Sequence, residues 1–236
     1  MPIKAIFFDM DGTLVHMPGS TPQEWLMSVY TRLGLDFEFA KVQQAYKAAE
    51  EQWKRRVRVS LGYSRASFVE WNRLILKELG IDGDVKSLAE RVQNGFENPT
   101  DELFPEVRQV LEELKRRKLT LGILSHRPLG AIRSSLKSHK IEKYFACLVN
   151  PQEAGAFFGK LDEKLWQYAL DKLDVKPAEA MHVGDDYETD VLGAKQGGLM
   201  PVLLDRTGRH HKADCLKLND LTGLLDVSKS CNANHS

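Results

Sequence analysis

Two aspartates separated by one residue, Asp9 and Asp11, follow an apolar, β-favouring run at residues 3–8 (IKAIFF). Side chains alternate along a strand, so acids at positions i and i+2 can face the same space. Two anions held that close repel each other unless a cation or a shared proton offsets them. Gly12 and Thr13 come next and predict a turn. The pattern therefore predicts a site in which two carboxylates act together, rather than an ordinary solvated turn.

A second acidic group lies in residues 180–190 (AMHVGDDYETD), after another apolar run. Gly184 allows the backbone to turn sharply, and Asp185, Asp186 and Asp190 then occur within six residues. A divalent cation with oxygen ligands is the usual way to offset such a density of negative charge. The alternative is a solvated loop that opens a helix, because the first turn of a helix favours acidic side chains.

A serine closes a third apolar run, residues 119–125 (LTLGILS). Alone, a serine after a strand is a weak signal, because turns contain serine for ordinary reasons. His126 and Arg127 follow Ser125. The planar guanidinium of Arg127 could bind a phosphate, or the residue could lie at the rim of a site.

These segments, in this order, resemble the motifs of the haloacid dehalogenase (HAD) superfamily. FFDMDGTLV (residues 7–15) resembles motif I, and Ser125 resembles the serine or threonine of motif II, which hydrogen-bonds a phosphoryl oxygen. GDDYETD (residues 184–190) resembles motif IV, GDDxxxD, in which the first acid ligates Mg²⁺. Relatives often carry Asn after the motif II residue, where this chain has His126.

Motif III of the superfamily is a lysine in a segment like GKPDP, just before a helix. Here residues 159–163 read GKLDE, so both prolines are absent. Lys160 is the best candidate because it precedes a helical pattern one helix–strand unit ahead of motif IV. Lys164 and Lys143 are rivals, since a chain with many surface lysines makes chance matches easy.

The resemblance implies a Mg²⁺-dependent phosphatase that works through a covalent intermediate. Asp9 would be the nucleophile that forms an aspartyl-phosphate, and Asp11 would protonate the leaving alcohol and then activate water. Mg²⁺ would be held by the Asp9 carboxylate, the Asp11 backbone carbonyl and Asp185. Lys160 and Ser125 would contact phosphoryl oxygens, where charge develops in the transition state.

Further residues have supporting roles in this scheme. His126 and Arg127 are candidates for substrate binding, together with Ser125 and Lys160. Thr13 is expected in the same set and is expected to brace the turn and the Asp11 side chain. The remaining acids, Asp186 and Asp190, are expected to stand behind the metal ligands or to bind a metal-coordinated water.

A first strand is followed by a long helical stretch, and from about residue 104 strands alternate with helices, which predicts βαβ units and a parallel sheet. The fold class is therefore α/β, a doubly wound parallel sheet with a Rossmannoid, HAD-like core. Strands are predicted at 3–8, 119–124, 145–149, 180–183 and 200–204, and helices at 106–118, 128–138, 162–173 and 188–196.

Between the first strand and the rest, apolar residues recur at helical spacing in residues 22–34, 38–58, 66–80 and 84–96. This insertion has the position of the superfamily's helical, C1-type cap, which in capped members closes over the core and supplies the pocket for the leaving group. We expect the core at residues 1–15 and 100–228, the helical cap at residues 16–99, and a disordered tail at residues 229–236.

The predicted sheet explains why acids so far apart in the sequence could act together. In open α/β sheets, ligands bind outside the carboxyl ends of the strands, near a switch in strand order. Asp9, Ser125 and Asp185 all follow predicted strands. They are therefore expected to meet around one ligand.

Length and composition agree with a small soluble enzyme, and the resemblance implies that its substrate is a small phosphorylated metabolite. The chain has 236 residues, and its 33 Lys and Arg balance 33 Asp and Glu, so charge gives no case for a nucleic-acid partner. Three widely spaced cysteines without a CxxC pair predict free thiols in a reducing cytoplasm. No transmembrane run or signal peptide is visible, so no membrane partner is expected. The protein is expected to be a monomer or a homodimer.

Three other functions remain possible at this stage. A phosphomutase would return the phosphoryl group to its substrate. A haloacid dehalogenase shares the fold and the nucleophile but attacks carbon and needs neither Mg²⁺ nor an acid at position 11. A non-enzymatic receiver-like domain would be phosphorylated on an aspartate as a signal. Among substrates, phosphoglycolate, sugar phosphates and nucleotides are all open.

Overall fold

The computed structural model describes residues 2–16, 21–97, 101–208, 210 and 213–233. The chain divides into two compact units, Met1–His16 with Glu102–Ser236, and Met17–Asp101. The division falls one and two residues from the boundaries expected from the sequence. The antiparallel pairing of β2 (Val15–His16) with β3 (Glu102–Leu103) keeps both short strands in the first unit, and the residues between them fall in the second.

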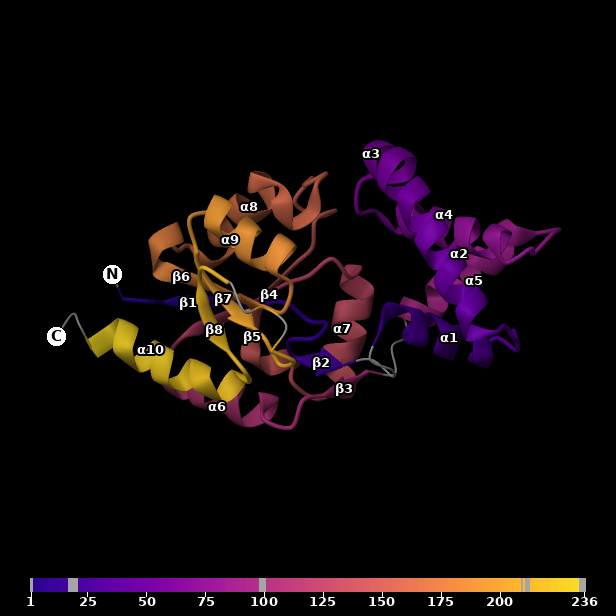
Figure 1. The fold of residues 1–236 in the computed structure, drawn as a ribbon. Helices are drawn as coiled ribbons and strands as arrows, with labels where there is room; N and C mark the ends of the chain where they lie inside the picture. The colour runs from indigo at the N-terminus through magenta and orange to yellow at the C-terminus, as the bar shows by residue number, and fades with distance from the viewer. Residues whose placement is uncertain (1, 17–20, 98–100, 209, 211–212, 234–236) are drawn as a thin grey trace. The chain divides into compact units, whose positions relative to one another are not determined.

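The first unit is built on a six-stranded sheet with the order β5-β4-β1-β6-β7-β8. Every neighbouring pair in it is parallel, so the predicted fold class, a doubly wound α/β sheet, is confirmed. Figure 1 shows helices on both sides of this sheet. The strands are β1 (Ala5–Phe8), β4 (Thr120–Leu124), β5 (Phe145–Val149), β6 (Ala180–Gly184), β7 (Met200–Leu204) and β8 (Leu216–Leu218).

Alternating side chains of β1 divide the core into two layers. Ile6 and Phe8 pack on one side of the sheet with apolar residues of α6, α7 and α10, and Ala5 and Phe7 pack on the other side with α8 and α9. Because both faces are covered, the central strands can be apolar throughout, as parallel strands usually are. The helices are α6 (Val107–Arg116), α7 (Leu129–Ser138), α8 (Glu163–Leu173), α9 (Leu192–Gln196) and α10 (Leu224–Ala233).

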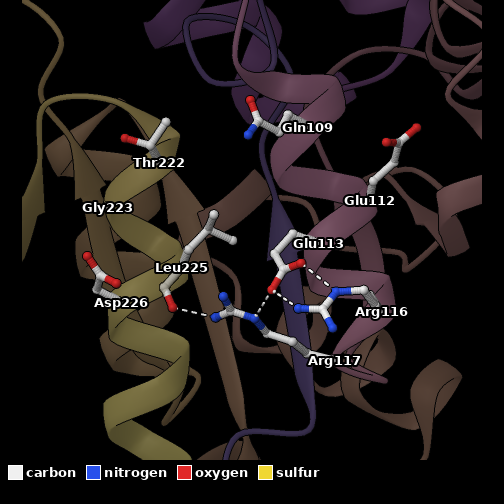
Figure 2. Close-up of a pocket in the computed structure, with 9 residues that line it drawn as sticks. All are labelled: Gln109, Glu112, Glu113, Arg116, Arg117, Thr222, Gly223, Leu225 and Asp226. Atoms are coloured by element: carbon white, nitrogen blue, oxygen red, sulfur yellow. Dashed lines mark hydrogen bonds and ion pairs between the residues drawn. The ribbon is translucent and has the colours of Figure 1, made fainter.

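The expected disordered tail at residues 229–236 is wrong over residues 229–233, which belong to α10; residues 234–236 lie outside the described part of the chain. The polar sequence carries no helical period, but α10 docks on α6, as Figure 2 shows for the groove between them. Arg117 donates hydrogen bonds to the Leu225 carbonyl and, at 2.8 Å, to Ser228 Oγ. Tertiary contacts thus stabilise a helix that propensity alone does not indicate.

The second unit contains the predicted helices, α1 (Pro22–Arg32), α2 (Phe39–Gln52), α4 (Arg65–Glu78) and α5 (Val85–Glu97). Thr21 and Ser64 cap α1 and α4 by accepting backbone N–H groups of the first turn. The helix predicted at 38–58 continues from α2 through a π-helical turn, η1 (Trp53–Val57), into α3 (Arg58–Leu61). These helices share their own apolar core. Among the described residues, no helix combines the length and the apolar character needed to cross a membrane.

Candidate active site

The three strand ends singled out in the sequence lie side by side in the sheet. Phe8, the last residue of β1, is in register with Ile123 of β4 on one side and Val183 of β6 on the other. Because the strands are parallel, the residues that follow them emerge at the same edge. Asp9, Ser125 and Asp185 therefore leave the sheet together, at the switch point where ligands bind in such folds.

Lys160 is the lysine that reaches this edge. Its side chain is 2% exposed, and its Nζ contacts Asp9 Oδ1 and lies 2.6 Å from Asp190 Oδ1. The two rival lysines are exposed, and the ammonium of Lys143 lies over the Tyr144 ring, 5.1 Å from its centroid. The structure thus brings Lys160, and neither Lys164 nor Lys143, to the nucleophile candidate.

The two prolines expected in motif III are absent, and side chains from outside that motif fix the Lys160 backbone instead. The residue lies in a short 3-10 turn, η3 (Gly159–Leu161), directly before α8. Its backbone N–H donates to His126 Nε2 at 3.2 Å, and its carbonyl accepts from Trp166 Nε1 at 2.7 Å. His126, expected to bind substrate, has in this structure the role of fixing the Lys160 backbone. Because its Nε2 accepts a hydrogen bond, the imidazole is the neutral tautomer protonated at Nδ1.

Both carboxylate oxygens of Asp190 have hydrogen-bond partners. Its Oδ1 contacts Lys160 Nζ and lies 2.8 Å from His182 Nε2, and its Oδ2 accepts the Asp186 N–H at 3.0 Å. Gly184 makes room for it, since a Cβ there would overlap the Asp190 side chain. Asp190 is therefore the partner of Lys160 and His182, and its expected place behind the metal ligands stays a prediction.

The site has more buried negative charge than its lysine can offset. Burial, with the neighbouring Asp190 and Asp11 carboxylates, raises the pKa of Asp9 to about 7 despite the adjacent Lys160. Burial, with Asp9 and Asp190, raises the pKa of Asp185 to about 8. Burial would also raise the pKa of Asp190, but Lys160 and His182 together hold it well below its usual range. Asp9 and Asp185 are therefore the carboxylates whose negative charge is not fully offset.

The arrangement of these acids fits a divalent cation. One oxygen each of Asp9, Asp185 and Asp190 lies within 4.8 Å of the others. The motif I turn closes the same space, because Gly12 has a positive φ of 69° and a Cβ there would overlap the Asp185 carboxylate. Hard cations such as Mg²⁺ prefer oxygen ligands of this kind. Since both oxygens of Asp190 already accept hydrogen bonds, Asp9 and Asp185 are the carboxylates best placed to bind the cation.

Asp11 is held by Arg127. The guanidinium donates from Nε to Asp11 Oδ2 at 2.9 Å and from Nη2 to Asp11 Oδ1 at 2.5 Å, a two-pronged ion pair. The Arg127 side chain is only 7% exposed, so of its two expected positions, phosphate ligand or rim residue, the rim is wrong. The backbone N–H of Arg127 donates to Ser125 Oγ at 3.3 Å. Ser125, the residue directly after β4, therefore helps to hold this arginine in place.

Two other expected site residues, Thr13 and Asp186, have local contacts of their own. Thr13 was expected to brace the Asp11 side chain, but its hydroxyl is buried without a hydrogen-bond partner among the described residues, and Arg127 holds Asp11 instead. Asp186 caps the π-helical turn η5 (Tyr187–Val191) that leads into α9, accepting from Thr189 N at 2.7 Å. Its carboxylate thus starts this helix, and its expected place behind the metal ligands stays a prediction.

Arg206 is a residue of the site that sequence reasoning missed. It follows β7, and it donates to the Gly12 carbonyl at 3.2 Å, to the Thr13 carbonyl at 3.0 Å and to Glu106 at 2.6 Å. It thereby fixes the motif I turn from more than 190 positions away. A lone arginine after a strand carries no local signal of this role.

Comparisons with known proteins agree with this geometry. A family model described as haloacid dehalogenase-like hydrolase matches residues 3–198. The ribulose-1,5-bisphosphate 5-phosphatase of Halopiger xanaduensis is 25% identical over 205 residues, covering 85% of this chain and 84% of the relative. The phosphoglycolate phosphatase of Synechococcus elongatus is 29% identical over 202 residues, covering 85% and 82%.

A solved structure extends the likeness to the whole fold. The L-2-haloacid dehalogenase of Xanthobacter autotrophicus matches with a TM-score of 0.74 at 19% identity, covering 96% of this chain and 98% of the other. At that identity the likeness concerns the fold alone. The family model spans most of the chain, and the residues that resemble its motifs meet at one edge of the sheet. The chain therefore belongs to the haloacid dehalogenase-like hydrolases.

Proposed function

We propose that this protein is a Mg²⁺-dependent phosphatase that hydrolyses a small phosphorylated metabolite through an aspartyl-phosphate on Asp9. The observation that carries the proposal is the buried Lys160, which contacts both Asp9 and Asp190 at a strand edge shared with Asp185. The phosphatases among its relatives support the reaction class. A cytoplasmic location is part of the same proposal.

Asp9 attacks the phosphorus atom, forming a bond between its carboxylate oxygen and phosphorus while the bond to the leaving oxygen breaks. Lys160 lowers the barrier because its ammonium lies where negative charge collects on the nucleophile and the phosphoryl oxygens. Asp9, Asp185 and the Asp11 carbonyl would hold Mg²⁺, which would offset the negative charge of the nucleophile and the phosphate. Ser125 donates a hydrogen bond from its hydroxyl to a phosphoryl oxygen, while its Oγ accepts the Arg127 N–H.

Asp11 serves as acid and then as base. It gives a proton to the leaving alkoxide, and its carboxylate then takes a proton from the water that attacks the aspartyl-phosphate, releasing inorganic phosphate and restoring Asp9. Asp11 suits this role because its side chain is 42% exposed and so can reach both substrate and water. A dehalogenase has no use for an acid at this position or for a further, half-buried carboxylate at Asp185, and both are present here.

The decisive experiment measures phosphate release from para-nitrophenyl phosphate with Mg²⁺ and after exhaustive chelation. We expect turnover with Mg²⁺ and a loss of at least about a hundredfold on chelation, because the acids at the site would then repel the substrate. Halide release from 2-chloropropionate in place of phosphate release would favour the dehalogenase. A phosphorylated sugar that is isomerised without net phosphate release would favour the mutase. Activity that survives chelation would disprove the metal assignment.

The raised pKa values of Asp9 and Asp185 predict how Mg²⁺ binding depends on pH. Without metal, the folded state keeps protons that an unfolded aspartate loses near pH 4, so the stability that these groups contribute is lost as pH rises toward 7–8. Mg²⁺ replaces those protons, and its affinity should rise over the same window. We expect the increase in Tm caused by 5 mM Mg²⁺ to be several degrees at pH 8 and close to zero at pH 5.

Differential scanning fluorimetry at the two pH values checks this expectation, with Asp185→Asn as the control variant. The variant should lose most of the Mg²⁺-dependent increase at pH 8. An equal increase at both pH values, or an unchanged increase in Asp185→Asn, would place the metal elsewhere.

A further inference from the structure

His182 is a buried polar residue in the middle of the otherwise apolar strand β6. It is 1% exposed, and its neighbours Ala180, Met181 and Val183 pack in the core. Its Nε2 lies 2.8 Å from Asp190 Oδ1, whereas its Nδ1 has no hydrogen-bond partner among the described residues. A buried polar atom without a partner lowers stability. Packing alone therefore does not account for a histidine at this position.

The ring of His182 is a neutral donor. A proton on Nδ1 would be a buried N–H without a partner, and burial lowers the pKa of His182 although the adjacent Asp190 carboxylate raises it. The pKa of Asp190 stays well below its usual range despite burial, so its carboxylate is ionised and accepts the Nε2 proton. His182 thus supplies a single hydrogen bond, and Asp190 receives it.

This hydrogen bond fixes the carboxylate that pairs with the active-site lysine. Asp190 Oδ1 accepts from both His182 and Lys160, and Asp190 Oδ2 accepts the backbone N–H of Asp186 at 3.0 Å. The strand β6 holds His182, and the backbone holds the Asp186 donor, whereas lysine has a long and flexible side chain. The two rigid donors therefore set the plane of the carboxylate, and the lysine adapts to it.

The direction of the lysine N–H groups depends on where that carboxylate lies. An ammonium has three N–H donors. Those of Lys160 contact Asp9 and, at 2.6 Å, Asp190, and no third partner is found among the described residues. One N–H is thus left for a phosphoryl oxygen. Donors stabilise a transition state when they are already aimed at the developing charge, so this aim matters for the rate.

Trp166 joins the support of the ammonium to the support of the lysine backbone. Its ring packs edge-on against the His182 ring, with centroids 4.9 Å apart, and its Nε1 donates to the Lys160 carbonyl at 2.7 Å. Gly193 and Gly197 leave room for it, since a Cβ at either position would overlap the Trp166 side chain. Two side chains in contact with each other therefore hold both ends of Lys160.

We propose that His182 is a positioning residue that acts through Asp190 to aim the Lys160 ammonium at the phosphoryl group. The inference rests on the proposed phosphatase function and deepens it. Among the described residues, the one polar contact of His182 is Asp190, so it acts through that carboxylate and not on the substrate. Without this hydrogen bond, the Asp190 carboxylate turns about its remaining bond to the Asp186 N–H, and the ammonium follows it away from Asp9.

The test compares two replacements of His182 with para-nitrophenyl phosphate as substrate and Mg²⁺ present. His182→Leu removes the donor and should lower kcat by about tenfold, less than the loss of a catalytic donor itself. KM should change by less than about threefold, because the misplaced charge acts mainly in the transition state. His182→Gln carries an amide N–H in the place of the ring Nε2–H and should keep kcat within about threefold of the wild type.

Leu170→Val is the matched control for a loss of packing. Leu170 lies on α8, is 2% exposed and packs in the same apolar layer as Trp166. This variant should lower the urea unfolding midpoint and leave kcat unchanged. If kcat falls as far in Leu170→Val as in His182→Leu, or if His182→Gln is as slow as His182→Leu, then His182 is a packing residue and the proposal is wrong.

The wild-type protein tests the hydrogen bond even if His182→Leu does not fold. Long-range ¹H–¹⁵N spectra should show the His182 ring as the neutral tautomer protonated at Nε2, and a ring protonated at Nδ1 alone would refute the proposal. Equal kcat in the wild type and both His182 variants would refute the positioning role and leave the phosphatase function intact. Absence of phosphate release by the wild type would instead refute the phosphatase function on which the inference rests.

Discussion

Asp9→Asn is expected to lower kcat by about four orders of magnitude or more, because the atom that attacks phosphorus is lost. The change is nearly isosteric and leaves Lys160 paired with Asp190, so the fold should persist. Rapid acid quench followed by intact-protein mass spectrometry should show no added phosphoryl group. Circular dichroism and the urea unfolding midpoint confirm that the loss is chemical and not structural.

Asp11→Asn supplies the contrast. This variant keeps the nucleophile and loses the acid and base, so turnover should fall while a fraction of the protein still accumulates as phosphoenzyme, above all with an aryl phosphate whose leaving group needs no proton. The pair of variants separates the two carboxylates of motif I. Phosphoenzyme in Asp9→Asn at the wild-type level would show that another residue is the nucleophile.

Lys160→Met is expected to impair both catalysis and stability. The side chain of methionine fills a similar volume, but Asp9 and Asp190 are left buried without their cation. Removing one partner of a buried ion pair typically costs about 3–5 kcal/mol of unfolding free energy. Loss of a charge aimed at the transition state lowers kcat by about a hundredfold to a thousandfold. Urea unfolding and steady-state kinetics measure the two effects.

Lys164→Met is the matched control for that experiment. Lys164 lies four residues later, in the first turn of α8, and is exposed. Its replacement should change the unfolding free energy by less than about 0.5 kcal/mol and leave kcat unchanged. Because Mg²⁺ offsets some of the unpaired negative charge, it should restore part of the stability lost in Lys160→Met. Similar behaviour of the two variants would mean that Lys160 is not the lysine of the active site.

The sequence alone determined the residue types of the site and the order of the elements that carry them. Asp9 and Asp185 were predicted because each follows a short apolar run, and such runs are local patterns that a buried parallel strand imposes. The helices of the second unit were predicted for a similar reason, since a 3.6-residue apolar period needs no knowledge of distant neighbours. Lys160 was identified by its place before a helix.

Only the tertiary structure decided which side chains meet. Arg127 was expected either as a phosphate ligand or at the rim, and its pairing with Asp11 depends on β4 lying next to β1 in the sheet. Arg206 supports the motif I turn because the segment that follows β7 lies next to that turn, although the two are far apart in the sequence. Helix α10 is held by Arg117, which donates to its backbone and to Ser228, and by apolar residues that pack in the core. A local pattern specifies an element, but a side chain's partner and the charge around it are set by the packing of distant segments.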